Sequence, residues 1–359
     1  MPRASGPPGE RGARRPIPAM TRIAVLGTGA NGASIGADLA SRGHDVTLID
    51  QWPAHVEAMR ARGVRIEMPG AVLEQRVHAL HLCDVCTLRE PFDIVLLVVK
   101  AYDTRWATQL IAPYLKPGGL LAGVQNGMTA DAIAEIVGPE RTMGCVIEIS
   151  SALFEPGVVM RHSPPERSWF AVGSLHPATA GREEEVAALL RCSGRVDVVA
   201  DIRATKWMKL VSNATTLVST ALLGLSIHEA AAIPAMRELM VRSGEEALAT
   251  GAALGHPLLP IFGMSPEDLR GGNRPVAVLL DKLLGGFTLP HTTTTVLQDW
   301  QKGRHSEVDD LNGLVAAEAL RLGRPAPVNA AIAALAREVE RGRLAPAPGN
   351  LERLAALCR

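Results

Sequence analysis

Short apolar runs alternate with amphipathic stretches through the N-terminal half of the chain. Residues 22–50 contain an apolar strand (RIAVLG), a glycine turn, an amphipathic helix and a second strand (HDVTLID), which together predict a βαβ unit. The continuous apolar runs at 92–99 (FDIVLLVV) and 119–124 (GLLAGV) are typical of strands buried on both faces of a parallel sheet. Shorter strands are predicted through 143–149 and 158–172.

The pattern changes near Arg203, where long Ala- and Leu-rich stretches with helical spacing replace the strand-like runs and continue almost to the C-terminus. With 359 residues, the chain is longer than a single hydrophobic core usually supports. We therefore predict an α/β sheet domain at 20–200 and an all-helical substrate and catalytic domain at 201–345. A Pro-, Gly- and Arg-rich leader at 1–19 is predicted to be disordered, and 346–359 to be a C-terminal tail.

Composition narrows the possible partners. Lys and Arg together number 37, as do Asp and Glu, so no net field favours nucleic acid or an acidic membrane surface. No apolar run reaches the roughly 18 residues of a membrane span, and the leader lacks the apolar stretch of a signal peptide. The five cysteines are scattered, which favours a reducing compartment. We expect a cytoplasmic protein with a small-molecule substrate.

A GxGxxG motif lies directly between the first strand and the first helix. Its residues are Gly27, Thr28, Gly29, Ala30, Asn31 and Gly32. Gly27 permits the tight turn, Gly29 lets the backbone approach a pyrophosphate, and Gly32 lets helix and strand pack closely, while the helix N-terminus offers free N–H groups to the anion. The position of the motif predicts a Rossmann NAD(P)-binding domain over 20–200. A glycine turn that binds no nucleotide is the alternative.

Asp50 ends the second strand, where a carboxylate accepts hydrogen bonds from the adenosine ribose hydroxyls and repels a 2′-phosphate. This position favours NAD over NADP. Taken alone, a solvated aspartate at the end of a strand is an equally good interpretation.

The helical half opens with KWMKLVSN, in which Lys206, Lys209 and Asn213 share one face of a helix. A lysine beside the apolar wall of a cleft can donate a proton to an oxygen that becomes an alkoxide. A solvated basic stripe is the alternative. Asn126 follows the strand at 119–124, at the sheet edge where such folds bind ligands, although Asn126-Gly127 is also a common turn sequence.

Near the C-terminus, Gly303 is predicted to end one helix and Ser306 to cap the next, with Asp309 as the partner in a capping box. Glu307 then lies in a first turn, where its alternative role is to favour the helix dipole. Cys83 and Cys86 have CxxC spacing without a second cysteine pair or a neighbouring pair of histidines, so no metal site is predicted.

Taken together, these stretches resemble the ketopantoate reductase family (2-dehydropantoate 2-reductases) from residue 20 to about residue 342. The matching stretches are GTGANG at 27–32, VVKAYDT at 98–104, QNGM at 125–128, KWMKLVSNA at 206–214 and LQDWQKGRHSEVDDLNG at 297–313. The resemblance implies an α/β fold with a Rossmann domain followed by a helical domain like the C-terminal domain of 6-phosphogluconate dehydrogenase. It also implies NAD(P)H-dependent reduction of a 2-oxo acid to a 2-hydroxy acid, normally with NADPH, and a homodimer is possible.

By this resemblance, Lys209 is the general acid and Glu307 orients the substrate and that lysine. Asn126 and Lys100 then line the nicotinamide and substrate side of the cleft, and Asn213 holds the substrate. Thr294 and Thr295 stand where the family has a serine pair, and they can still hydrogen-bond a substrate carboxylate.

Three departures from the family pattern bear on specificity. Leu217 and Ile227 replace two asparagines of the substrate pocket, and Gln51 replaces an arginine expected for the 2′-phosphate. Because an unpaired polar group costs roughly 1–3 kcal/mol on burial, we expect a different or broader 2-oxo acid than ketopantoate. With Asp50, Gln51 favours NADH. An oxidative dehydrogenase acting on another hydroxy compound and a non-catalytic NAD(P)-sensing protein are the alternatives.

Overall fold

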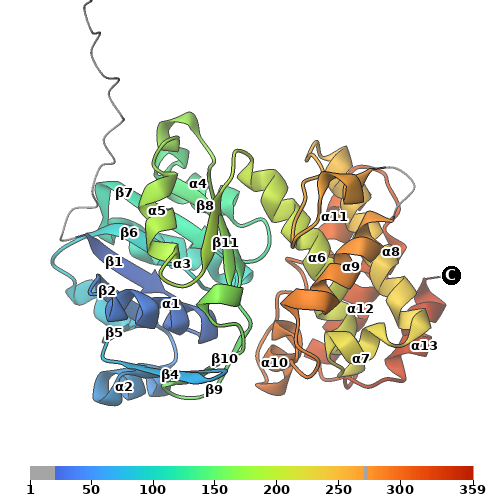
Figure 1. Cartoon of the computed structure of the whole chain (residues 1–359), viewed down its shortest axis with the longest axis horizontal. Helices are drawn as coiled ribbons and strands as arrows, with labels where there is room; N and C mark the ends of the chain where they lie inside the picture. Colours follow the sequence, from blue (N-terminus) through green and yellow to red (C-terminus); the bar gives the residue numbers. More distant parts are fainter. Residues whose placement is uncertain (1–20, 271–273, 359) are drawn as a thin grey trace, which may run out of the picture.

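The computed structural model describes residues 21–270 and 274–358. The chain forms two lobes, a sheet-containing lobe from the N-terminal half and a helical lobe from the C-terminal half, as Figure 1 shows in blue to green and in yellow to red. The leader predicted at 1–19 lies outside the described residues. This architecture confirms the predicted fold class of a Rossmann domain followed by a helical domain.

The N-terminal lobe has twelve strands and five α-helices among the described residues. The strands are β1 (Arg22–Leu26), β2 (Asp45–Asp50), β3 (Val64–Met68), β4 (Ala71–Gln75), β5 (His78–His81), β6 (Phe92–Leu97), β7 (Leu115–Val124), β8 (Thr142–Glu148), β9 (Ser151–Glu155), β10 (Val158–Arg161), β11 (Trp169–Ser174) and β12 (Arg195–Val198). The helices are α1 (Ala30–Ser41), α2 (Pro53–Arg62), α3 (Thr104–Ile111), α4 (Ala130–Val137) and α5 (Glu183–Leu190).

The main sheet has eight strands in the order β12-β11-β8-β7-β6-β1-β2-β5. All neighbouring strands are parallel except β8 and β11. Strand β1 pairs with β2 on one side and β6 on the other, so the chain order reverses at β1 and leaves a crevice at the carboxyl ends of β1 and β6. Apolar clusters cover both faces of the sheet, which explains why β1 and β6 are almost continuously apolar.

A smaller four-stranded sheet, with the order β4-β3-β10-β9, packs beside α1. The strand predicted at 158–172 is divided between the two sheets: β10 belongs to the small one and β11 to the large one. Pro164 and Pro165 lie between them, and proline cannot donate a ladder hydrogen bond. The chain therefore changes sheets at this point.

The helical lobe follows β12 directly. Its helices are α6 (Ile202–Leu223), α7 (Ile227–Ala231), α8 (Pro234–Ala253), α9 (Pro275–Lys282), α10 (Thr295–Gln301), α11 (Asn312–Arg321), α12 (Pro327–Glu340) and α13 (Asn350–Leu357). Nearly every residue of α6 is buried, as expected for a helix that the others surround, and it extends from the sheet edge into this lobe (Figure 1). The segment predicted as a tail at 346–359 contains α13, whose Asn350 donates a hydrogen bond to the Leu222 carbonyl.

One predicted helix start is wrong. Ser306 does not cap a helix; residues 307–311 form a bend and turns, and α11 begins only at Asn312. Both the backbone N–H and the hydroxyl of Ser306 donate to Glu340 on α12, at 2.9 and 2.6 Å. The serine therefore binds a neighbouring helix, and Glu307 projects from a turn and not from the first turn of a helix. No helix among the described residues combines the length and apolarity needed to span a bilayer.

Candidate active site

A cleft of about 600 Å³ lies where β1, β6 and β7 end and the helical lobe faces the sheet. The sheet lobe contributes the glycine loop, the end of β2 and the loops after β6 and β7, and the helical lobe contributes α10 and the loop after it. The predicted site residues that line it are Gly27, Gly29, Ala30, Asn31, Gly32, Asp50, Lys100, Asn126, Thr295 and Glu307. This is the size and position expected of a cofactor and substrate site.

The glycine loop fits a dinucleotide. At Gly27, φ is +91°, and a Cβ there would lie 2.7 Å from the Val99 backbone nitrogen. A Cβ at Gly32 would lie 2.0 Å from the Gly27 carbonyl oxygen, so only glycine lets α1 approach β1. A Cβ at Gly29 would meet nothing within 4 Å, which means that this glycine leaves space in the cleft. Backbone geometry requires the first and third glycines, whereas the second keeps the N-terminus of α1 open to a pyrophosphate.

Asp50 connects the glycine loop to the segment that follows β2. Its carboxylate accepts hydrogen bonds from the Thr28 backbone N–H at 2.7 Å and from the Trp52 backbone N–H at 2.8 Å. The Thr28 hydroxyl also points to this carboxylate at 3.3 Å, so Thr28 supports the loop and does not itself line the cleft. A carboxylate held in this way is already oriented for ribose hydroxyls, because each oxygen retains acceptor capacity.

His55, which sequence analysis did not single out, secures the other side of the loop. It is fully buried, and its Nδ1 accepts a hydrogen bond from the Gly157 N–H at 2.9 Å. Its Nε2 lies 2.9 Å from the Thr28 carbonyl oxygen and therefore carries the proton and donates to it. Burial lowers the His55 pKa, in keeping with the neutral form. Nothing in the sequence around His55 indicates this role.

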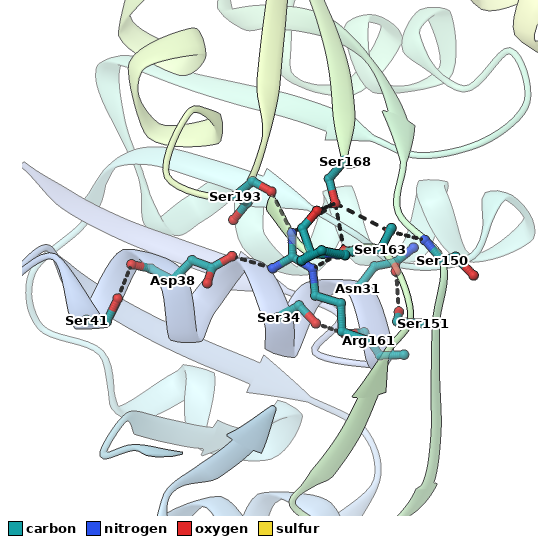
Figure 2. Close-up of polar contacts among 12 residues, drawn as sticks. Asn31, Ser34, Asp38, Ser41, Ser150, Ser151, Arg161, Ser163, Ser168 and Ser193 are labelled. Atoms are coloured by element: carbon teal, nitrogen blue, oxygen red, sulfur yellow. Dashed lines mark hydrogen bonds and ion pairs between the residues drawn. The ribbon is translucent and has the colours of Figure 1, made fainter. Parts of the chain in front are cut away.

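A buried arginine stabilises the wall beside α1. The Arg161 guanidinium donates to Asp38 on α1 at 2.6 Å, to the Ser193 carbonyl at 2.5 Å and to the Ser168 hydroxyl at 3.0 Å. Figure 2 shows this network beside the turn between β8 and β9, where the Ser151 hydroxyl donates to the Asn31 side chain at 2.5 Å. Asn31 is therefore held from outside the glycine loop.

Lys100 meets two carboxylates from the opposite lobe. Its ammonium donates to Asp299 on α10 at 2.5 Å and lies 3.7 Å from Glu307. Burial opposes the charge of Lys100, but Glu307 and Asp299 outweigh it, and the Lys100 pKa is raised. Glu307 also accepts a hydrogen bond from the Ala101 N–H at 3.0 Å. The two lobes are thus joined at the cleft, and Asp299, part of a motif already quoted, is a site residue that sequence analysis did not assign.

The polar face of α6 lies against the carboxyl edge of the sheet, as its spacing predicts. Lys206 is buried and donates to the Gln125 and Cys145 carbonyls at 2.9 and 3.0 Å, and burial lowers its pKa to about 8. Asn213 donates to the Asn126 side chain at 3.1 Å. Helix α6 is therefore hydrogen-bonded to the loop after β7 and to the middle of β8.

Lys209, between these two residues on the same face, does not line the cleft itself. Its ammonium is ion-paired with Glu148 at the end of β8 and lies 5.0 Å from the centre of the Phe262 ring. Ser151, three residues after Glu148, lines the cleft, and so does Ile147, the residue before Glu148. Lys209 is thus held just behind the cleft wall, away from bulk water. Glu148 gave no signal in the sequence, because nothing local marks its pairing with a helix of the other domain.

The two threonines have different environments. The Thr294 hydroxyl donates to the Leu217 carbonyl at 3.0 Å and caps α10, so it does not face the cleft. Thr295 lines the cleft, and its buried hydroxyl has no hydrogen-bond partner among the described residues. Neither Leu217 nor Ile227 lines the cleft. Within the described residues, no group of three potential metal ligands occurs, and Cys83 and Cys86 are exposed free thiols outside the cleft.

The fold and the cleft define a two-domain dinucleotide-binding protein of the dehydrogenase and reductase class. Comparison with known proteins makes the assignment specific. The family model "Ketopantoate reductase PanE/ApbA" matches residues 23–174, and "Ketopantoate reductase PanE/ApbA C terminal" matches residues 201–340. The chain belongs to the ketopantoate reductase family, which confirms the resemblance seen in its motifs.

Relatives match over most of their length. A 2-dehydropantoate 2-reductase of Mesorhizobium japonicum is 28% identical over 89% of this chain and 99% of its own. The crystal structure of a PanE/ApbA family ketopantoate reductase from Ralstonia eutropha superposes with a TM-score of 0.76 at 26% identity, covering 90% of this chain and 99% of that one. D-mandelate dehydrogenase, solved with NADH and anilino(oxo)acetate, has a TM-score of 0.80 at 19% identity over 90% and 99%, a likeness of fold.

Proposed function

We propose that this protein reduces a 2-oxo acid to the 2-hydroxy acid with a reduced nicotinamide dinucleotide. The observation that carries the proposal is the cleft itself, which brings the open glycine loop, Asn126, Lys100 and Glu307 together from both lobes. A reduced nicotinamide supplies a hydride to the carbonyl carbon of the substrate. The remaining chemistry belongs to the chain: binding the acid, orienting its carbonyl group and delivering one proton to its oxygen.

Lys209 is the proton donor in this proposal. Because Lys209 lies behind the cleft wall, the proposal requires its ammonium to move toward the cleft when substrate binds; the ion pair with Glu148 leaves two of its three N–H donors available for a carbonyl oxygen. As hydride arrives at the carbon, the proton moves from Lys209 to the oxygen and produces the hydroxyl. Burial against Phe262 and the protein interior keeps water from replacing the lysine as the donor.

Substrate orientation falls to the polar groups around the lysine. The Thr295 hydroxyl is a candidate to donate to the substrate carboxylate, because Thr295 lines the cleft and its hydroxyl has no hydrogen-bond partner among the described residues. Thr294 acts indirectly, by capping the helix that carries Thr295. The hydrogen-bonded pair of Asn213 and Asn126 connects the substrate side to the nicotinamide side.

We infer a preference for NADH. The Asp50 carboxylate lines the cleft where the adenosine ribose binds, and Gln51 beside it offers no positive charge to a 2′-phosphate. We also retain the expectation of a 2-oxo acid other than ketopantoate, or of a broader range. This expectation rests on the family pattern, in which asparagines stand at Leu217 and Ile227, and not on the cleft itself, because neither residue lines it.

A spectrophotometric screen tests the proposal. Purified protein is assayed with a panel of 2-oxo acids, ketopantoate included, with NADH and NADPH in turn. We expect Lys209→Ala to lower kcat by roughly 100- to 10,000-fold, the usual contribution of a positioned general acid. Lys116→Ala, which removes a half-buried lysine paired with Asp93 outside the cleft, is the matched control and should keep full activity. A fully active Lys209→Ala variant would exclude the lysine as the donor, and a panel without turnover would exclude the reaction.

A further inference from the structure

Two positive charges in the cleft have no negative partner. The Lys and Arg side chains that line the cleft are Lys100, Lys302 and Arg304. Lys100 is ion-paired with Asp299, whereas Lys302 and Arg304 form no ion pair with a described residue. Among the described residues, no side chain forms an ion pair or a hydrogen bond with the ammonium of Lys302 or the guanidinium of Arg304. Arginine and lysine side chains elsewhere in the protein are commonly ion-paired, so these two are the cations of the cleft lining that no described carboxylate pairs with.

Both side chains reach from the helical lobe across to the sheet lobe. The Lys302 ammonium lies 4.4 Å from the centre of the Phe154 ring on β9, and the Arg304 guanidinium lies 5.1 Å from the Trp52 ring at the start of α2. Aromatic rings attract a cation but carry no net charge, so the charges are not neutralised. The cationic segment, residues 302–304, therefore contacts the sheet lobe at β9 and at the start of α2, in the same cleft that the glycine loop lines.

The backbone around the cationic segment is fixed. The Arg304 N–H donates to the Asp299 carbonyl at 2.8 Å, and the Tyr102 hydroxyl of the sheet lobe donates to the His305 carbonyl at 3.0 Å. Burial lowers the Lys302 pKa; nearby Arg304 and Lys100 lower it further, and Asp299 opposes them. Like charges are thus held close together in a place where an anion would relieve their repulsion.

The glycine loop has no cationic side chain of its own to pair with an anion. A dinucleotide brings two negative charges on its pyrophosphate to the N-terminus of α1, and the residues of the loop, 27–32, include no lysine or arginine. Within the loop itself, the backbone N–H groups at the start of α1 supply the binding. The opposite wall of the cleft supplies two unpaired cations.

We propose that Lys302 and Arg304 bind the pyrophosphate of the dinucleotide from the helical lobe, so that the cofactor bridges the two lobes. The inference rests on the dinucleotide site of the proposed function and is independent of the substrate. Asp50 makes the 2′-position of the ribose the less favourable place for these cations to find an anion, because its carboxylate would repel a phosphate there. The pyrophosphate is common to NADH and NADPH, so both cofactors should depend equally on the cationic segment.

Binding measurements on the full chain test this without turnover. The probes are ADP-ribose, which carries the pyrophosphate without nicotinamide, together with NADH and NADPH, titrated calorimetrically into wild type, Lys302→Gln, Arg304→Gln and the double variant. Each single variant should raise the dissociation constant of all three probes by roughly tenfold, the loss of one charge-assisted contact, and the double variant by more. The ratio of NADH to NADPH affinity should not change.

Arg353→Gln is the matched control, since it removes one exposed arginine from α13 and should leave all three affinities unchanged. Thermal unfolding of every variant confirms that the fold is intact. Unchanged affinity in the double variant would overturn the proposal, and so would a loss confined to NADPH, which would assign the cations to a 2′-phosphate. A wild type that binds the probes but reduces no oxo acid would overturn only the proposed reaction, whereas one that binds none would overturn this inference and the dinucleotide site together.

Discussion

Replacing Arg161 with methionine should destabilise the N-terminal lobe severely. The guanidinium is completely buried and makes four hydrogen bonds, including an ion pair with Asp38. Methionine fills much of the same volume but leaves the Asp38 carboxylate buried without its partner. Breaking a buried ion pair from one side costs about 3–5 kcal/mol. For a unit of about 150–250 residues, 1 kcal/mol shifts the unfolding temperature by about 2–4 °C. We therefore expect a decrease of roughly 6–20 °C.

The assay is thermal unfolding followed by circular dichroism, with Asp38→Leu and the double variant Asp38→Leu/Arg161→Met alongside. Removing both charges eliminates the unpaired carboxylate, so the double variant should be more stable than Arg161→Met alone. Arg195→Met, which removes an exposed arginine of β12, should change stability by less than about 0.5 kcal/mol. A decrease below about 2 °C for Arg161→Met, or strictly additive losses in the double variant, would refute the reasoning.

Three further outcomes follow from the site. Gly29→Ala should keep the unfolding temperature but weaken dinucleotide binding, because its new Cβ meets no atom within 4 Å. Gly32→Ala should lower the unfolding temperature itself, because its new Cβ meets the Gly27 backbone. Calorimetric titration and thermal unfolding distinguish the two effects. Burial lowers the Lys206 pKa to about 8 from 10.5, so the unfolded chain binds more protons between these values and wild-type stability should rise with pH across that window. Lys206→Met should abolish that rise in unfolding temperature, and a rise equal to that of wild type would contradict the assignment. Glu307→Gln retains an acceptor for the Ala101 N–H but loses the negative charge beside Lys100. The value of kcat/KM should therefore decrease by roughly tenfold or more, while the unfolding temperature changes little. An unchanged kcat/KM would exclude an electrostatic role for Glu307.

Local sequence predicted the parts of the fold that local geometry determines. The βαβ unit at 22–50 appears as β1, α1 and β2, and the buried runs at 92–99 and 119–124 appear in β6 and β7. The apolar periodicity and glycine spacing that mark these elements lie within single segments. The small sheet had no comparable signal in the sequence. Its strands β3 and β10 pair with each other although they are far apart along the chain, with β4 to β9 between them.

Ser306 shows how the same reasoning fails. A serine followed three residues later by an acidic residue is a common start of a helix, and that pattern is present. In the folded chain, Glu340 of α12 accepts both hydrogen bonds that Ser306 donates, and the turn continues to Leu311 before α11 begins. A capping pattern measures only a local preference. A carboxylate from a packed neighbouring helix competes with it, and no window of sequence contains that neighbour.

The same distinction explains which site residues could be found in advance. Helical spacing placed Lys206, Lys209 and Asn213 on one face, and that face does lie against the sheet edge. Spacing could not say which partner each would find there, and the partners divide their roles: carbonyl groups hold Lys206, whereas a carboxylate holds Lys209. The assignment of Lys209 as the donor therefore comes from the family motif and not from helical spacing.

Two ion pairs connect the sheet lobe to the helical lobe beside the cleft. Lys100 of the sheet lobe is bound by Asp299 of the helical lobe, and Lys209 of the helical lobe by Glu148 of the sheet lobe. The two ion pairs have opposite polarity, because the cation belongs to the sheet lobe in the first and to the helical lobe in the second, so together they connect the lobes in both directions. Lys302 and Arg304 are the cations of the cleft lining that form no ion pair with a described residue, and they are the groups that we propose for the pyrophosphate.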